Sequence, residues 1–105
     1  EWLAMFAVVG DFSDVLKATT LWASGSATNT TGFSALPASF RAYYGSFGQT
    51  EAMLGQYAGF WTSTPMSAGE GAENAHNWYL LYNDPYIQNG DLDKATGLSC
   101  RCVRD

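Results

Sequence analysis

The sequence contains little cysteine, little basic charge and no long apolar run. Its two cysteines are Cys100 and Cys102, and its five lysines and arginines stand against ten aspartates and glutamates, giving a net charge of −5. A chain with so few cations lacks the basic stripe that binds nucleic acid, and the same shortage disfavours an anionic membrane surface. No apolar run approaches the roughly 20 residues of a membrane-spanning helix, so we expect no membrane insertion.

The sequence is instead rich in aromatic residues, with four Trp, six Tyr and six Phe in 105 residues. This content, together with only 14% charged residues, predicts a folded globular chain. Its length fits one domain over residues 1–105. Glu1 and Trp2 open directly into an apolar helical pattern without a start Met or a basic leader, so we expect the chain to be processed or cut from a longer one.

The beginning of the chain predicts two short helices. Apolar residues at helical spacing cover residues 2–9, and Gly10 is expected to end that helix. Asp11 has a side chain typical of an N-cap, which predicts a second short helix directly after it. The apolar side chains that this second helix would bury are Phe12, Val15 and Leu16.

After residue 32 the pattern changes to short runs of aromatic and β-branched residues separated by Gly, Pro, Asn and Asp, which is typical of strands. The expected strands and strand-like segments are residues 33–37, 40–47, 59–64, 77–82 and 98–105. Residues 65–76 and 83–97 read as long polar loops. Helices followed by strands predict an α+β domain with a small, mostly antiparallel twisted sheet.

The polar residues do not form a recognisable catalytic or metal site. His76 is the only histidine, and its neighbourhood of asparagines favours a surface residue, so neither a Ser-His-Asp set nor a zinc site can be assigned. Asn89, Asp91 and Asp93 alternate as oxygen ligands of calcium can, but the Gly and Glu of a full calcium loop are absent. We therefore favour a solvated turn, and we expect no metal and no cofactor.

The two cysteines cannot easily bond to each other. On a strand, residues two apart lie about 6.6 Å from each other. A disulfide needs Cβ atoms about 3.5–4.5 Å apart. At least one of Cys100 and Cys102 is therefore expected to pair elsewhere, and the sequence offers no other cysteine. As a metal site, the pair alone would leave two ligands missing.

Four segments occur in the order of a known family. They are "TGFSALPASFR…GSF" at 31–47, "GFWTSTP" at 59–65, "NWYLL" at 77–81 and "DKATGLSCRCVRD" at 93–105. Together they resemble the Fibrobacter succinogenes major paralogous domain, and residues 1–11 fit the helix that precedes these segments in the family. The resemblance implies a C-type-lectin-like, formylglycine-generating-enzyme-like fold.

The family usually begins upstream of this sequence with a segment that contains a cysteine. The resemblance therefore implies that the domain is N-terminally incomplete, and that Cys102 forms a disulfide with a partner outside this chain. Cys100 has no counterpart in the family pattern, so its state stays open.

The resemblance further implies a secreted or cell-surface bacterial protein that binds a glycan or a protein without catalysis. Its C-terminal half would supply the contacts, because loop Tyr and Asn side chains combine rigid contact area with adaptable hydrogen bonds. The ligand-binding candidates are Tyr79, Tyr82, Asn83, Asp84, Tyr86, Gln88 and Asn89. Trp61 and Trp78 are expected to belong to the core instead.

Two other functions compete with this hypothesis. The first is a structural subunit of an extracellular assembly, in which a second copy or a completing segment of the parent chain fills an unpaired sheet edge. The second is an enzyme of the formylglycine-generating branch that would use Cys100 and Cys102 as copper-binding thiols, although the family resembled is not the catalytic one.

Overall fold

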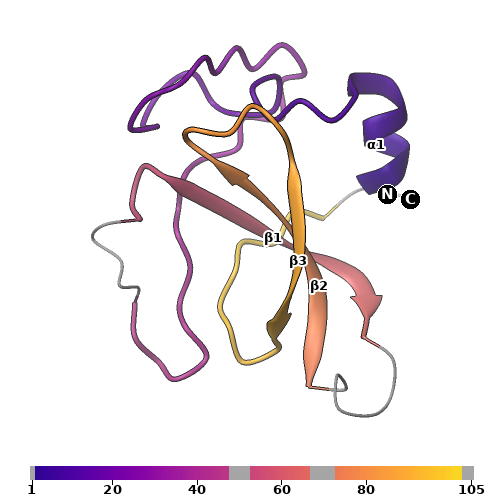
Figure 1. Cartoon of the computed structure of the whole chain (residues 1–105), viewed down its shortest axis with the longest axis vertical. Coiled ribbons are helices and arrows are strands. Elements are labelled where there is room, and N and C mark those ends of the chain that lie inside the picture. The colour runs from indigo at the N-terminus through magenta and orange to yellow at the C-terminus, as the bar shows by residue number, and fades with distance from the viewer. Residues whose placement is uncertain (1, 48–52, 67–72, 103–105) are drawn as a thin grey trace.

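The described residues of the protein form a three-stranded antiparallel sheet with one short helix and long irregular segments (Figure 1). A computed structural model describes residues 2–47, 53–66 and 73–102. The elements are α1 (Trp2–Val9), β1 (Tyr57–Pro65), β2 (Asn74–Leu81) and β3 (Gln88–Asp93). The strands lie in the order β1-β2-β3. No helix within the described ranges is long and apolar enough to cross a membrane.

The predicted α+β, C-type-lectin-like arrangement with N-terminal helices is wrong for this chain. The only helix in the described residues is α1, which has the predicted bounds. It ends at Gly10, whose φ of +71° suits glycine and whose N–H donates to the Phe6 carbonyl at 2.8 Å. Eight residues of helix beside three strands make the sheet the main regular structure.

The predicted second helix does not form, because distant backbone groups take the hydrogen bonds that it would need. Ser13 donates its N–H to the Pro85 carbonyl at 2.7 Å, and the Asp11 carbonyl accepts the Ile87 N–H at 2.8 Å. The segment therefore pairs with the connection between β2 and β3 and makes only a single turn afterwards. Phe12, expected to be buried, is 52% exposed, whereas Leu16 is fully buried.

The predicted strands are partly present. The runs at 59–64 and 77–82 largely coincide with β1 and β2. Within the described residues, the other three runs contribute only isolated bridges, which pair Ala35 with Lys17, Arg41 with Gly97 and Ser99 with Phe60. A further bridge pairs Ser39, which lies between two of these runs, with Ala58. Residues 103–105 of the last run lie outside the described residues.

The expected loops are also revised. The loop at 83–97 contains β3, so that prediction is wrong, and the loop at 65–76 includes the beginning of β2. Residues 67–72 of that second loop lie outside the described residues.

The pairing register gives the sheet two distinct faces. Gly59 lies opposite Tyr79 on β1 and β2, and Asn77 lies opposite Gly90 on β2 and β3. Because paired residues share a face and neighbours along a strand alternate, these positions lie on one side, together with Tyr57. We call this side the tyrosine face and the opposite side the core face.

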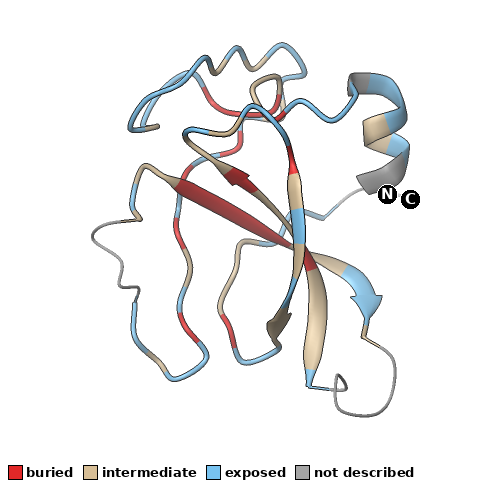
Figure 2. Cartoon of the chain, viewed as in Figure 1, coloured by how far each residue is buried: buried red, intermediate tan, exposed pale blue. Residues whose placement is uncertain are grey.

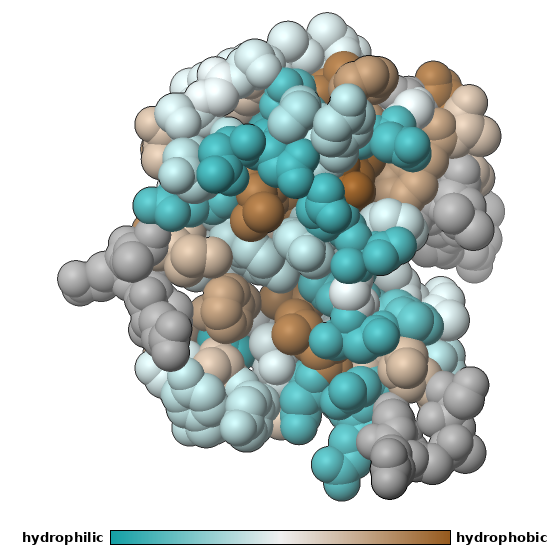
Figure 3. All heavy atoms as spheres, in the orientation of Figure 1, coloured by the Kyte–Doolittle hydropathy of each residue, from teal (hydrophilic) through white to brown (hydrophobic). Residues whose placement is uncertain are grey.

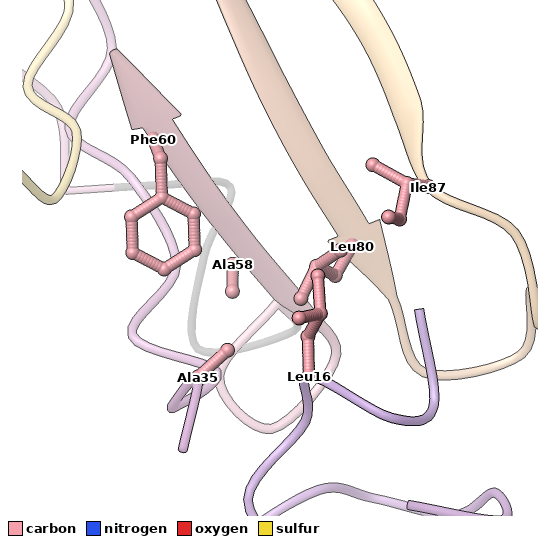
Figure 4. Packing of buried hydrophobic residues seen from close by; sticks show 6 residues of the cluster. All are labelled: Leu16, Ala35, Ala58, Phe60, Leu80 and Ile87. Atoms are coloured by element: carbon pink, nitrogen blue, oxygen red, sulfur yellow. The ribbon is translucent and has the colours of Figure 1, made fainter. Parts of the chain in front are cut away.

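The core face carries the main hydrophobic cluster. It consists of Leu16, Ala35, Ala58, Phe60, Leu80 and Ile87 (Figure 4). Leu16 and Leu80 are completely buried, and burial of one such side chain contributes about 1.5–3 kcal/mol. Trp78 packs on the same face, edge to face with Phe6 at 4.6 Å between ring centroids. Burial is concentrated at the start of β1 and near the end of β2 (Figure 2).

A buried lysine fastens the N-terminal segment to the sheet. Lys17 is 1% exposed, and its ammonium Nζ donates to the Asp14 carboxylate at 3.0 Å and to the Asp84 carbonyl at 3.1 Å. The Ser13 hydroxyl donates to the same Asp84 carbonyl at 2.8 Å. We call Ser13, Asp14, Lys17 and Asp84 the Lys17 cluster. It fixes the connection between β2 and β3 against the start of the chain.

Candidate functional site

A hollow of about 390 Å³ lies over the tyrosine face of the sheet. This size is within the range of small-ligand sites, roughly 300–1,000 Å³. We call it the Tyr79 hollow. Its lining residues are Phe40, Met53, Tyr57, Asn77, Tyr79, Leu81, Gly90, Asp91 and Leu92.

Three aromatic rings form a continuous surface beside this hollow. Tyr57 and Tyr79 are stacked, with ring centroids 5.5 Å apart and an angle of 21° between the planes. Phe40 packs edge to face against Tyr57 at 5.3 Å. Tyr57 is only 8% exposed, so the more accessible Tyr79 rests on a ring that is itself held in place. Such packing gives a pre-arranged aromatic surface.

The Asn77 amide below these rings is incompletely hydrogen-bonded. Asn77 is 1% exposed, and its Nδ2 donates to the Tyr57 hydroxyl at 3.4 Å. Its Oδ1 has no hydrogen-bond partner among the described residues. A buried polar atom without a partner costs about 1–3 kcal/mol. Because this oxygen is itself fully buried, a ligand donor could supply the missing bond only after neighbouring side chains shift.

Gly90 keeps the space above Asn77 and Tyr79 free of side-chain atoms. A Cβ at Gly90 would lie 3.5 Å from Asn77 Oδ1 and 3.6 Å from Tyr79 Cε1, both ordinary van der Waals distances. The position would thus accept alanine without a clash, but the added methyl would cover the amide and the ring. Glycine inside a strand often allows another group to approach closely.

The aromatic rings of the hollow are uncharged, and the carboxylate of the lining residue Asp91 pairs with His76. Burial, together with repulsion from Tyr79, raises the pKa of Tyr57 to about 12, against a smaller opposite effect of the hydrogen bond from Asn77. The Tyr57 hydroxyl therefore stays protonated across the physiological range. The surface offers apolar ring faces beside hydroxyl and amide groups, which suits an uncharged polar ligand.

The sequence-predicted ligand-binding residues are divided between different parts of the structure. Tyr79 lines the hollow. Gln88 pairs with Tyr79 in the register, but its Nε2 donates to the Asp84 carboxylate at 2.9 Å. Asn89 is exposed on the core face, opposite Trp78. The other four candidates, which lie in the connection between β2 and β3, are Tyr82, Asn83, Asp84 and Tyr86.

The connection between β2 and β3 is organised by Asp84. The Asp84 carboxylate accepts the Tyr86 N–H at 2.9 Å, and its carbonyl belongs to the Lys17 cluster. Tyr86 is 52% exposed and stacks on Phe12 at 5.7 Å. The Tyr82 N–H donates to the Gln56 carbonyl at 2.9 Å, while Asn83 is exposed. These residues lie beside the N-terminal segment and do not line the Tyr79 hollow.

The calcium candidates lie on β3 and do not surround a common point. Asn89, Asp91 and Asp93 alternate along the strand, where side chains on one face are about 6.6 Å apart. The Asp91 carboxylate pairs with His76 on the neighbouring strand β2, and the Asp93 carboxylate accepts the Ala95 N–H at 2.7 Å. Across the described ranges, no group of three or more His, Cys, Asp or Glu side chains could hold a metal ion.

The cysteines and tryptophans can also be placed. Cys100 and Cys102 are both exposed free thiols in this chain, so pairing of Cys102 with a partner outside it stays a prediction.

Trp78 packs against the core as expected. Trp61 is half-buried and lies opposite Asn77 on the tyrosine face, outside the main cluster.

Sequence reasoning missed three residues that shape the hollow: Tyr57, Asn77 and Gly90. Asn77 and Tyr79 are two residues apart in an aromatic strand, a spacing that places both on one face. That signal was available from the sequence. Gly90 could not be connected with them, because its pairing with Asn77 depends on a register that only the structure gives.

Comparisons with known proteins identify the family. Searches of the curated proteins and of the solved structures each found no match. The family model of the Fibrobacter succinogenes major domain matches residues 7–104. This match covers nearly the whole chain and confirms the resemblance of its four ordered segments. The chain belongs to the Fibrobacter succinogenes major domain family.

Proposed function

We propose that this protein is a non-catalytic, extracellular or cell-surface binding module that recognises a glycan through the Tyr79 hollow. The observation that carries the proposal is the stacked pair Tyr57 and Tyr79, whose rings line the hollow. Beside them, the fully buried Asn77 oxygen has no partner in the described part of the chain, and Gly90 adds no side chain next to it or to the Tyr79 ring. The proposal rests on these contacts and not on a C-type-lectin-like fold.

The chemistry of the hollow suits a sugar ring. A pyranose presents C–H groups on its faces, which pack on aromatic rings, and hydroxyl groups at its rim, which can donate to an amide oxygen. Tyr57 and Tyr79 supply the aromatic surface, and Asn77 supplies the oxygen. A protein partner would need an interface of roughly 800 Å² on each side. A hollow of about 390 Å³ is better matched to one or two sugar rings.

The proposal is tested by covering the hollow without disturbing the fold. Gly90→Ala adds one methyl at van der Waals distance from Asn77 and Tyr79. On an oligosaccharide array followed by calorimetry, we expect wild type to bind and Gly90→Ala to lose about tenfold or more in affinity, since one displaced hydrogen bond and its ring contact are worth about 1.4 kcal/mol or more.

Asn89→Ala is the matched control. Asn89 is the neighbour of Gly90 on the same strand, but its exposed side chain belongs to the opposite face. Both variants should unfold in urea within about 0.5 kcal/mol of wild type, as is usual for surface substitutions. Binding that survives in Gly90→Ala, an array without any glycan ligand, or capture of a protein ligand insensitive to Gly90→Ala would contradict the proposal.

A structural role is the second candidate, because β3 is an edge strand. No strand in the described residues pairs with its outer side, and such an edge can accept a strand from a neighbour. Asp91 and Asp93 on this edge, and the overall charge of −5, oppose pairing with a second copy. On the face that Figure 3 shows, the described apolar residues form only separate patches between hydrophilic ones. A monodisperse monomer in light scattering at high concentration would exclude a homo-oligomeric assembly.

A further inference from the structure

A second hollow adjoins the first on the other side of Phe40. Phe40 lines both of them. The second hollow has a volume of about 610 Å³. We call it the Arg41 hollow, and the lining residues that matter here are Ser39, Phe40, Arg41, Phe47, Leu54 and Leu98.

The backbone around this hollow is fixed by hydrogen bonds to other segments. The Ser39 N–H donates to the Tyr57 carbonyl at 2.9 Å. Arg41 and Gly97 exchange both of their backbone hydrogen bonds, at 2.9 Å and 2.8 Å. The residues on both sides of Phe40 are therefore tied to β1 and to the segment before Ser99, so the two hollows keep a set position relative to each other.

The Arg41 hollow contains the second unpartnered polar atom of the structure. Ser39 is 7% exposed, and its hydroxyl Oγ has no hydrogen-bond partner among the described residues. Only one other buried side-chain polar atom in the described ranges shares this condition, and it is the Asn77 oxygen of the Tyr79 hollow. The two atoms thus belong to residues that line two hollows, and Phe40 lines both of these hollows.

The Arg41 hollow differs from the Tyr79 hollow by its positive charge. Arg41 is exposed, and its guanidinium lies 5.9 Å from the centre of the Phe47 ring. No carboxylate of the described residues lies within ion-pair distance of it. A guanidinium presents a planar fork of donors that matches the two oxygens of a carboxylate. Leu54, Leu98 and Phe47 supply an apolar wall beside this fork.

The geometry points to an acidic glycan as the ligand, with a uronic acid residue in the Arg41 hollow and a neighbouring sugar in the Tyr79 hollow. The sugar carboxylate would pair with the Arg41 guanidinium, and the ring face would pack on the apolar wall. This inference rests on the proposed function and adds to it the charge and the minimum length of the ligand.

The test compares two forms of one ligand. The probes are a short oligomer of galacturonic acid and the same oligomer with its carboxyl groups methyl-esterified, titrated into the whole protein. We expect wild type to bind the acid form about three- to fivefold more tightly, since an ion pair with an exposed guanidinium contributes about that factor at most. This preference should shrink as salt is added.

Three variants test which residue causes the preference for the acid form. Arg41→Gln should remove the preference for the acid form and leave the affinity for the ester unchanged. Arg41→Lys should restore only part of the preference, because an ammonium lacks the fork. Arg101→Gln is the matched control: this exposed arginine stacks over Phe33 at 4.4 Å, outside both hollows, and its loss should change nothing.

The outcomes separate this inference from the proposed function. Equal binding of acid and ester in wild type, or an unchanged preference in Arg41→Gln, would overturn the acidic subsite while binding itself stands. Binding of neither form by the folded protein would overturn the acidic subsite, and the oligosaccharide array would then decide separately whether the proposed function stands. Tighter binding of a polyglutamate peptide than of the galacturonic acid oligomer would also overturn it, in favour of a protein ligand.

Discussion

The two faces of the sheet differ in whether their buried side chains make all the contacts that they can. On the core face, Leu80 is fully buried and packs against Leu16, which comes from the opposite end of the chain. On the tyrosine face, Asn77 is nearly as deeply buried, but its Oδ1 has no partner in the described part of the molecule. One side of a thin sheet thus supplies stability, and the other side holds stacked rings beside a buried polar atom that has no partner among the described residues.

The largest expected effect is on the core face. Leu80→Ala removes a fully buried side chain from the centre of the hydrophobic cluster. We expect it to lower the free energy of unfolding by about 2–5 kcal/mol, measured by urea denaturation. A loss below about 1 kcal/mol would mean that the core face is not the main source of stability.

A somewhat smaller loss is expected from the Lys17 cluster. Lys17→Met keeps the length of the side chain but leaves the partly buried Asp14 carboxylate without its cation. We expect a loss of about 2–4 kcal/mol in urea denaturation, because breaking a buried ion pair strands the other charge. A variant as stable as wild type would show that well-packed apolar atoms replace this ion pair without cost.

On the tyrosine face, we expect alkaline pH to lower the stability of the protein through the buried Tyr57 hydroxyl. The pKa of Tyr57 is raised to about 12 in the folded protein, so the native state holds this proton more tightly than the unfolded chain does. The resulting stability is complete below about pH 10 and is lost as pH rises towards 12, amounting to about 3 kcal/mol.

Tyr57→Phe isolates this contribution. The difference in unfolding free energy between wild type and the variant should change between pH 8 and pH 11.5, with wild type losing more stability on the way up. Parallel curves for the two proteins over that range would mean that the Tyr57 hydroxyl is no better shielded in the folded state than in the unfolded chain.

The smallest effect should come from the unpartnered amide itself. Asn77→Leu replaces a buried group that lacks one hydrogen bond with an apolar side chain of similar size. We expect the free energy of unfolding to change by less than about 1 kcal/mol in either direction, while glycan binding is lost. A loss of several kcal/mol would show that Asn77 serves mainly to hold Tyr57 in place.

Much of the regular structure that carries the core face could be predicted from the sequence, because it follows from local patterns of apolar residues. The apolar residues before Gly10 predict α1, and the aromatic runs around Phe60 and Leu80 predict β1 and β2. The predicted second helix does not form, because Ser13 and Asp11 make backbone hydrogen bonds to distant residues in place of the local ones of a helix. β3 was missed because Asn, Gly and Asp favour turns, and only pairing with β2 keeps them extended.

The candidate site was less accessible to prediction than the fold. Tyr79 was among the predicted residues because the family resemblance places ligand contacts in the C-terminal half, where Tyr and Asn side chains suit recognition. Its partners Asn77 and Gly90 are linked only through the register between β2 and β3, and Phe40 reaches the site from an irregular segment. Such a hollow depends on contacts between residues far apart in sequence, and no local pattern encodes them.

The Lys17 cluster has a consequence for the order in which the protein folds. The bond from the Lys17 ammonium to the Asp84 carbonyl joins residues 67 positions apart. Closing so long a loop costs much conformational entropy. The Asp84 carbonyl, which accepts the bond, is held in position only after β2 and β3 have paired. The N-terminal segment should therefore acquire its structure last, and its amides should be the first to exchange with solvent when the native protein opens locally.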